Sequence, residues 1–548
     1  MPPMIERADV SADELIINTD IACSRTGKTR EPVGRMIQSP VVTAELKKLF
    51  RHSSHYLAGI LISLGLGFVS FPIFTRVFSV SDYGTIDLVA KVLLLLTALS
   101  KMGLQQSALR FYDGRLFSSD QSAARRYYST MFYGMALTAT SVMMVFWLAL
   151  GFAPKSLIDR SLAALLFLIS SLILVRALTS LLWVFVRVQE KTRLYSVFTA
   201  TTKVSTLAVI CLFIPWLGRS VRTYYSGTIV VEVGVVIILS AMLLRGCLVD
   251  LHGFDMTLFR TGLTFGLPLI FYELASITLD AGDRVLVRHY LGGDALGYYS
   301  VAYGMSDYVN NVLIVPINLA LAPIYMRLWT TEGQESTSEF LSRGLDLFFM
   351  ASAGILAVVM TTSHDAVIVF ASSKYRGADA LIPILVAGLL IYTSHAFLSA
   401  GLMIHKDTFT MAKLLAYSAL LNIGLNCVLL PRIGLQAAAL ATFLSYLFCI
   451  VLLRRASCRL LPLKIDLRAL GKYVFAAVVA WYAASHVELG PPVADLAGRF
   501  ALTLMLYGGL LYLMDSRVRA LPGYLFGPRR HPANVDNEEL AATPGSES

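Results

Sequence analysis

The chain has 548 residues, of which 56% are hydrophobic and 15% are charged, and its net charge is +10. A typical soluble domain carries about 25% charged residues, so this composition excludes an ordinary soluble protein. The basic residues lie mainly in loops beside apolar segments, which indicates membrane topology and attraction to anionic lipids, and no nucleic-acid partner.

Apolar segments recur along the whole chain at the length that a helix needs to cross a hydrocarbon core, about 20 residues. We therefore predict an all-α integral membrane protein with about fourteen transmembrane helices. The predicted helices span 57–76, 85–109, 128–150, 161–186, 196–217, 223–244, 258–281, 296–324, 341–362, 380–404, 411–430, 434–454, 469–486 and 497–515.

The two ends of the chain are polar, so residues 1–50 and 521–548 are predicted to be disordered tails. No cleavable signal peptide is recognised before the first apolar segment, which is therefore expected to stay as helix 1. With the N-terminus placed inside, the larger share of the loop Lys and Arg residues also lies inside. We expect a multi-pass protein of the inner (plasma) membrane with both termini in the cytoplasm.

Two motifs recur along the chain at nearly the same offset. The Pro-x-x-Gly motif at 215–218 recurs at 431–434, and the Arg-x-aromatic-x-x-x-Asp motif at 76–82 recurs at 288–294. Helices 1–6 are thus predicted to be duplicated as helices 7–12. Because six is even, both copies enter the membrane from the same face. This gives a parallel repeat with the substrate site in a central cavity between the two halves.

The repeat divides the chain into lobes. We predict an N-terminal lobe at 51–250, a C-terminal lobe at 251–460 and two further helices within 461–520.

Several charged residues fall inside predicted helices, where each costs about 2.5–3.5 kcal/mol at a helix centre. Helical spacing places Asp87, Lys91 and Lys101 on one stripe of the second helix, and Glu273 and Asp280 on one stripe of the seventh. Such stripes are expected either to line a wet cavity with cationic walls or to pair with each other. Basic side chains in a cavity suit an anionic head group. The candidate cavity residues are Arg76, Lys91, Lys101, Arg176, Lys203, Arg284, Arg288 and Asn311.

Four acidic residues are candidates for coupling transport to H⁺ or Na⁺, because intramembrane carboxylates carry protons in transporters. The alternative is that they neutralise Arg284 and Arg288. The coupling candidates are Glu273, Asp280, Asp283 and Asp307.

The sequence offers no motif for a catalytic centre. The six cysteines have no metal-ligand spacing and suggest no disulfide framework, so we expect no metal and no cofactor. The predicted outer loops are short, whereas a membrane glycosyltransferase or polymerase would need a long outer loop with catalytic carboxylates. We predict that the protein is not an enzyme.

The eleventh and twelfth helices carry the most specific signal. Leu-Asn-Ile-Gly-Leu-Asn at 421–426, Leu-Pro-Arg-Ile-Gly at 430–434 and Ala-Ala-Ala-Leu-Ala-Thr at 437–442 resemble the signature of bacterial polysaccharide-transport flippases. These flippases belong to the multidrug/oligosaccharidyl-lipid/polysaccharide exporter superfamily. Asp-Tyr-Gly at 82–84 and Leu-Gly-Tyr-Tyr-Ser at 296–300 are also similar to that family, and the resemblance spans about 50–515. Departures are the long N-terminal tail and Gln436, where the family often has glycine.

The resemblance implies two six-helix lobes that face each other, followed by two more helices. It also implies a flippase that moves undecaprenyl-diphosphate-linked oligosaccharide repeat units across the inner membrane by alternating access. The implied partners are this lipid-linked oligosaccharide, membrane lipids, and a polysaccharide polymerase with its export proteins. The alternatives are a multidrug exporter of the same superfamily, which should have an acidic cavity, and the glycosyltransferase or polymerase.

Overall fold

The computed structural model of the chain describes residues 64–152, 160–189, 191–244, 249, 251–311, 315–516 and 518–519. The predicted tails at 1–50 and 521–548 lie outside these residues, as does the start of predicted helix 1. Every regular element in the described ranges is a helix. Eleven helical stretches among them are long and apolar enough to cross a membrane. The all-α membrane fold is therefore confirmed, whereas the number of fourteen spans stays a prediction.

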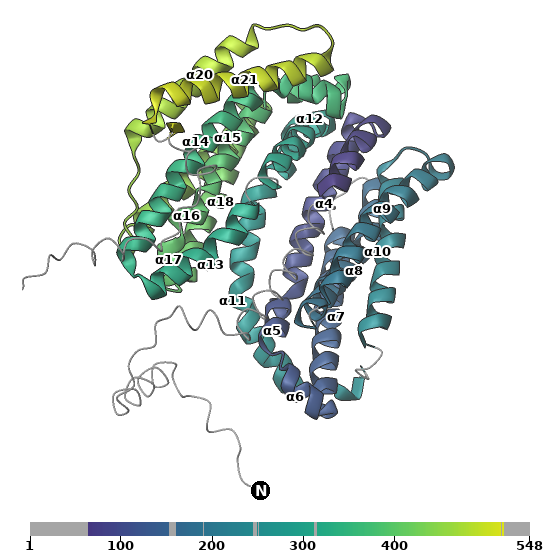
Figure 1. Cartoon of the computed structure of the whole chain (residues 1–548). Helices are drawn as coiled ribbons and strands as arrows, with labels where there is room; N and C mark the ends of the chain where they lie inside the picture. Colours follow the sequence, from purple (N-terminus) through teal and green to yellow (C-terminus); the bar gives the residue numbers. More distant parts are fainter. Residues whose placement is uncertain are drawn as a thin grey trace, which may run out of the picture.

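The first group of helices forms the N-terminal lobe (Figure 1). It consists of the helix Leu64–Val77, α4 (Val80–Lys101), α5 (Leu104–Arg110), α6 (Gly114–Ser119), α7 (Gln121–Phe152), α8 (Arg160–Val188), α9 (Thr192–Leu217) and α10 (Val221–Leu244). A short 3-10 helix, η1 (Leu251–Gly253), precedes the second group.

The second group forms the C-terminal lobe. It consists of α11 (Met256–Ala281), α12 (Asp283–Val309), α13 (Val315–Thr331), α14 (Gln334–Ala366), η3 (Val367–Ala371), η4 (Ser373–Ala378), α15 (Ile382–Thr393), α16 (His395–Leu398), α17 (Ala400–Ile404), α18 (Thr408–Ile433) and α19 (Gln436–Ser457). The last two helices, α20 (Leu467–Ser485) and α21 (Pro492–Met514), pack against α14 at the outside of this lobe.

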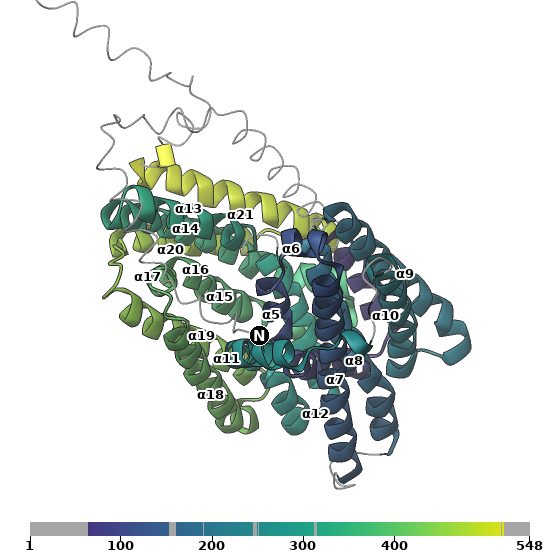
Figure 2. The same ribbon diagram turned by 90° about the horizontal axis from the view of Figure 1, so that it is seen from below.

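The two lobes meet along a few helices. α4 packs against α11 and α12, and α5 packs against α11. Seen from below, α5, α11 and α12 lie between the remaining helices of the two lobes (Figure 2). The charged stripes of the second and seventh predicted helices are thus placed at the boundary between the lobes.

The predicted duplication is visible in the backbone at both ends of α9 and α18. The residues that precede these helices, Lys191 and Asp407, have nearly equal φ and ψ, at −82° and 56° against −84° and 62°. At the other ends the glycines of the Pro-x-x-Gly motif, Gly218 and Gly434, have φ of 75° and 77°. A positive φ favours glycine, so the repeated glycine ends the helix in the same way in both lobes.

The segment between predicted helices 7 and 8 differs from the expectation. Residues 282–295 lie between the predicted helices 258–281 and 296–324, and Arg284 and Arg288 are predicted to lie there in an outer loop. α12 begins at Asp283 instead, and the chain turns at Gly292, whose φ is 87°. Asp283 and Arg284 are buried against other polar groups. Contacts with other helices therefore stabilise a helix in a segment that the sequence alone predicts to be a loop.

Glycines allow α4 to approach the C-terminal lobe closely near both of its ends. A Cβ added at Gly84 would lie 2.6 Å from the backbone nitrogen of Gly297 on α12. A Cβ added at Gly266 of α11 would lie 2.6 Å from the carbonyl carbon of Gly103, just after α4. Because such distances are too short for a real side chain, the lobes touch backbone to backbone at these two points.

Replacing Gly84 by alanine should lower stability, because the new methyl group meets backbone that cannot move away cheaply. We expect Gly84→Ala to cost about 1–3 kcal/mol, as other overpacking changes do. Gly424→Ala is the matched control, since Gly424 lies within α18 with no atom within 4 Å of an added Cβ. Thermal unfolding of the purified proteins should show a lower Tm only for Gly84→Ala. Equal Tm values would show that the close contact does not hold the lobes together.

Candidate transport site between the lobes

Three ion pairs cross from α4 to the C-terminal lobe, and we call them the charge ladder. Lys101 Nζ lies 2.5 Å from Glu273 Oε1, and Lys91 Nζ lies 3.3 Å from Asp280 Oδ2. The third pair joins Arg284 Nε to Asp87 Oδ2 at 2.8 Å. The residue numbers fall on α4 as they rise on α11 and α12, so the helices run antiparallel. The two predicted stripes therefore pair with each other across the lobe boundary, which was the alternative to a cavity with cationic walls.

The members of the ladder differ in how accessible they are. The Arg284 side chain is 1% exposed, whereas Glu273 and Asp280 keep 41% and 38% of their side-chain surface exposed. Their partners Lys101 and Lys91 are 14% and 19% exposed. A ligand can thus reach the lysine pairs without unfolding the helices, but it cannot reach Arg284.

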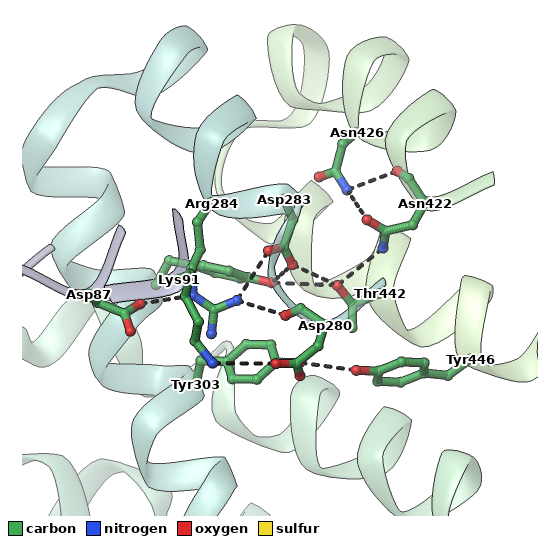
Figure 3. Close-up of polar contacts among 11 residues, drawn as sticks. Asp87, Lys91, Asp280, Asp283, Arg284, Tyr303, Asn422, Asn426, Thr442 and Tyr446 are labelled. Atoms are coloured by element: carbon green, nitrogen blue, oxygen red, sulfur yellow. Dashed lines mark hydrogen bonds and ion pairs between the residues drawn. The ribbon is translucent and has the colours of Figure 1, made fainter. Parts of the chain in front are cut away.

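Arg284 joins three backbone segments around one buried guanidinium group (Figure 3). Besides its bond to Asp87, its Nη1 donates to the backbone oxygen of Asp280 at 2.7 Å and to Asp283 Oδ1 at 3.3 Å. The guanidinium carbon lies 4.1 Å from the ring centroid of Tyr303. A buried cation is tolerated when carboxylates and hydrogen bonds compensate for lost water. Arg284 is therefore suited to fixing α4 against the C-terminal lobe.

Asp283 is buried in a polar cluster within the C-terminal lobe. Its carboxylate accepts hydrogen bonds from the hydroxyl of Tyr299 and, at 3.1 Å, from the hydroxyl of Thr442. Asn422 donates to Thr442 at 3.5 Å, and Asn426 donates to the side-chain oxygen of Asn422 at 3.2 Å (Figure 3). Carboxylate, hydroxyl and amide oxygens are the ligands that hard cations prefer. Within the described residues, no group of three or more His, Cys, Asp and Glu residues is placed to hold a metal.

Asp280 links the charge ladder to aromatic residues. Its other oxygen accepts a hydrogen bond of 2.8 Å from the hydroxyl of Tyr303, which lies 3.0 Å from the hydroxyl of Tyr446 (Figure 3). Asp280 thus holds Lys91 from the N-terminal lobe while its own position is fixed by Tyr303.

Arg76 lies away from the ladder, where it connects the lobes at the predicted outer end. Its guanidinium donates to the backbone oxygens of Val369 at 2.8 Å and Phe370 at 3.2 Å. In return, Lys374 Nζ donates to the backbone oxygen of Phe78 at 2.6 Å. Burial and the nearby charge of Arg76 lower the pKa of Lys374 below its ordinary value. We call these reciprocal contacts the outer clamp.

Residues 49–329, just over half of the chain, match the family described as polysaccharide biosynthesis protein. The chain belongs to this family. No curated protein matches the sequence.

Solved structures show the same fold as this polysaccharide biosynthesis family member. The lipid II flippase MurJ, in an inward closed conformation, matches with a TM-score of 0.67 and 12% identity over 85% of this chain and 98% of that chain. A multidrug resistance transporter of the MATE family and MOP superfamily matches in its inward-facing conformation, with a TM-score of 0.58 and 12% identity over 74% and 97%. An outward-facing conformation gives 0.54 and 12% over 75% and 94%. The predicted polysaccharide family is confirmed by the family match, and at 12% identity the solved structures show the fold alone.

The predicted site residues fall into two sets. Those that the structure brings together at the lobe boundary are Lys91, Lys101, Glu273, Asp280, Asp283 and Arg284. Outside this cluster lie Arg76, which joins the lobes at the outer clamp, and Arg176, Lys203, Arg288 and Asn311. Asp307 lies within electrostatic range of Asp280 and Lys91 of the charge ladder.

The second set has several local roles. Arg176 pairs with Glu232 inside the N-terminal lobe, beside Lys203. Arg288 is exposed, and Asn311 donates to the backbone oxygen of Asp307, four residues earlier. Of the groups that sequence reasoning left out of the site, Tyr303 and Tyr299 were signalled by their four-residue spacing. Thr442 and Asn422 lie in the segments that carried the family resemblance.

Removing the Arg284 charge should destabilise the protein strongly, because Asp87 and Asp283 would be left without their shared cation. We expect Arg284→Gln to cost about 3–5 kcal/mol, as for other broken buried pairs. The control is Arg343→Gln, which breaks the exposed pair of Arg343 with Glu339 and should change stability by about 0.5 kcal/mol or less. Chemical unfolding in detergent measures both. An Arg284→Gln protein as stable as the control would mean that Arg284 does not hold the lobes.

Proposed function

We propose that this protein is a flippase that moves undecaprenyl-diphosphate-linked oligosaccharide repeat units across the inner membrane for polysaccharide biosynthesis. The observation that carries the proposal is the charge ladder, in which basic residues of one lobe are neutralised by carboxylates of the other. The polysaccharide biosynthesis family and the flippase and transporter fold support it. In alternating access, the two lobes would separate first on one side of the membrane and then on the other.

The ladder suggests how an anionic substrate would drive this motion. When the lobes separate, Lys91 and Lys101 lose Asp280 and Glu273, and unpaired ammonium groups at bilayer depth are costly. A diphosphate group supplies replacement negative charge for both lysines. A ligand shifts a conformational equilibrium only by the difference in its affinity for the two states. The diphosphate would bind the two arrangements with different affinities, because it can bind Lys91 and Lys101 only after the carboxylates have moved away.

Coupling to H⁺ or Na⁺ is part of the proposal, and Asp283 is its best candidate. Among the four coupling candidates it is the one buried among several oxygen groups of other helices, including Thr442. Protonation or cation binding there would change the charge next to Arg284, with which Asp283 pairs at 3.3 Å. The coupling ion would thereby act on the residue that fixes α4. A polysaccharide polymerase and export proteins are proposed as partners.

Export of cationic drugs is the second candidate function, since the same fold occurs in a multidrug transporter. The more exposed members of the ladder are the carboxylates Glu273 and Asp280, and these would bind a cationic drug. In the flippase the lysines of the ladder would bind the anionic substrate, whereas in a drug exporter the carboxylates would bind the cationic drug. Exchanging the charges of a pair therefore distinguishes the two functions.

The double variant Lys101→Glu/Glu273→Lys keeps the ion pair but moves the positive charge from α4 to α11. We expect the folded protein to accumulate normally, whereas each single reversal should lower its amount because like charges face each other. Transport of lipid-linked repeat units should fall at least about tenfold, a change of about 1.4 kcal/mol. The matched control reverses the exposed pair Arg343–Glu339 and should keep full transport. Full transport by the Lys101→Glu/Glu273→Lys protein would mean that this pair is purely structural.

Deleting the gene tests the proposed reaction directly. We expect intact undecaprenyl-linked repeat units to accumulate in the cytoplasmic leaflet, because their synthesis continues without translocation. Labelling of intact right-side-out and inverted vesicles with a membrane-impermeant sugar reagent, followed by lipid extraction, measures the amount in each leaflet. Normal amounts in the periplasmic leaflet of the deletion strain would refute the flippase function, and drug sensitivity with normal polysaccharide would favour the exporter.

A further inference from the structure

A cavity of about 210 Å³ lies inside the N-terminal lobe, separate from the charge ladder. Its walls come from the helix Leu64–Val77 and from α8, α9 and α10. Phe74 and Tyr224 line it with aromatic surface, and Arg176, Lys203 and Glu232 line it with charge. The cavity is smaller than the roughly 300–1,000 Å³ pockets that enclose drug-sized ligands. It therefore suits a small head group and not an oligosaccharide.

The charged residues of the cavity lie near the middle of their helices. Arg176 is 16 residues from the start of α8 and 12 from its end. Lys203 is 11 and 14 residues from the ends of α9, and Glu232 is 11 and 12 residues from the ends of α10. Charges at the centre of a span are the most expensive to keep in a membrane and mark functional sites.

The three charges do not cancel. Arg176 forms a two-pronged pair with Glu232, with Nη2 at 2.9 Å from Oε1 and Nε at 3.0 Å from Oε2. Lys203 is exposed and has no hydrogen bond or ion pair with any residue that the structure describes. The cavity thus holds one cation that its own carboxylate does not neutralise.

The C-terminal lobe shows that the fold does not require these charges. In the repeat, α15 corresponds to α8 and α19 corresponds to α10. At the offset of 216 set by the Pro-x-x-Gly motif, Arg176 corresponds to Tyr392 on α15 and Glu232 corresponds to Phe448 on α19, so neither charge recurs. Tyr392 stacks instead on Tyr446 of α19, with ring centroids 4.6 Å apart and an interplanar angle of 25°. Aromatic packing fills the space in one lobe where the other keeps an ion pair and a cavity.

We propose that the N-terminal lobe cavity binds the phosphate group of an anionic lipid, with Lys203 and Arg176 as its ligands. Arg176 holds Glu232 with the paired geometry that guanidinium groups also use for phosphate. A bound phosphate takes the place of Glu232 at Arg176 and receives Lys203 as a second cation. Two kinds of lipid carry such an anionic phosphate. One is the undecaprenyl diphosphate carrier, and this choice rests on the proposed function. The other is a bilayer phospholipid such as phosphatidylglycerol.

The full-length protein in nanodiscs tests the site with two probes. The first is binding of unglycosylated undecaprenyl diphosphate in phosphatidylcholine nanodiscs. The second is retention of phosphatidylglycerol, counted by native mass spectrometry. We expect Lys203→Gln to weaken binding of the diphosphate lipid about tenfold, equivalent to about 1.4 kcal/mol. Lys203→Arg should stay close to the wild type because it keeps the charge. Arg193→Gln is the matched control, since Arg193 is an exposed cation on the same helix.

Glu232→Gln gives an expectation of opposite sign. It removes the carboxylate that competes for Arg176, so phosphate binding should become tighter, by about threefold or more. A purely structural ion pair predicts the reverse, namely weaker binding together with lower stability. If Glu232→Gln does not yield folded protein, the pair Lys203→Gln and Lys203→Arg decides the matter alone.

The outcomes separate this inference from the proposed function. Loss of phosphatidylglycerol retention in Lys203→Gln, with undecaprenyl diphosphate binding unchanged, would support the site and assign it to a bilayer phospholipid. Unchanged values of both measurements in Lys203→Gln would refute the site while leaving the flippase function intact. A wild-type protein that does not bind undecaprenyl diphosphate at all would count against the proposed function, whatever happens to phosphatidylglycerol.

Discussion

Compensation of charge across the lobe boundary is the constraint on which the rest of the structure depends. Ionised side chains are stable at bilayer depth only with a counter-charge or water, and α4 carries its charges toward α11 and α12. Each ion pair of the ladder has one member in each lobe. The lobes therefore attract each other by charge, in addition to the apolar cluster that Phe71, Val80 and Leu88 share with Leu296 and Tyr299 of α12. The proposed function requires that a second anion can open this interface by replacing the carboxylates.

The sequence indicated much of the fold but less of the site. Spans of about 20 apolar residues and the repeated Pro-x-x-Gly motif are local signals, and they led to the helices and to the duplication. Helical spacing also placed Lys91 and Lys101 on one face. The pairing of Lys91 with Asp280 depends on how the two lobes dock, and no local sequence pattern contains that information. For the same reason, Arg176 was expected in the central cavity and lies instead inside one lobe.

The two lobes share a backbone plan but differ in chemistry. Helix ends at Gly218 and Gly434 are nearly identical, yet the N-terminal lobe keeps charges at mid-height where the C-terminal lobe stacks Tyr392 on Tyr446. The C-terminal lobe in turn buries Asp283 among hydroxyl and amide groups. Duplication supplies matched scaffolds, and each scaffold has then acquired its own polar cluster. The two proposals divide the binding sites accordingly, with a lipid phosphate bound in the N-terminal lobe and a coupling ion bound at Asp283 of the C-terminal lobe.

The close glycine contacts at the two ends of α4 bear on how the two lobes could separate. α4 is a single helix of 22 residues, about 33 Å long at 1.5 Å per residue. The chain touches the opposite lobe near both ends of α4, where Gly84 meets Gly297 and where Gly103, two residues after the helix, meets Gly266. Because a helix is stiff, α4 can tilt away from the contact at one end while the contact at its other end stays closed. In the proposed alternating-access cycle, this would disfavour simultaneous opening of both entrances and so protect the cell's proton gradient.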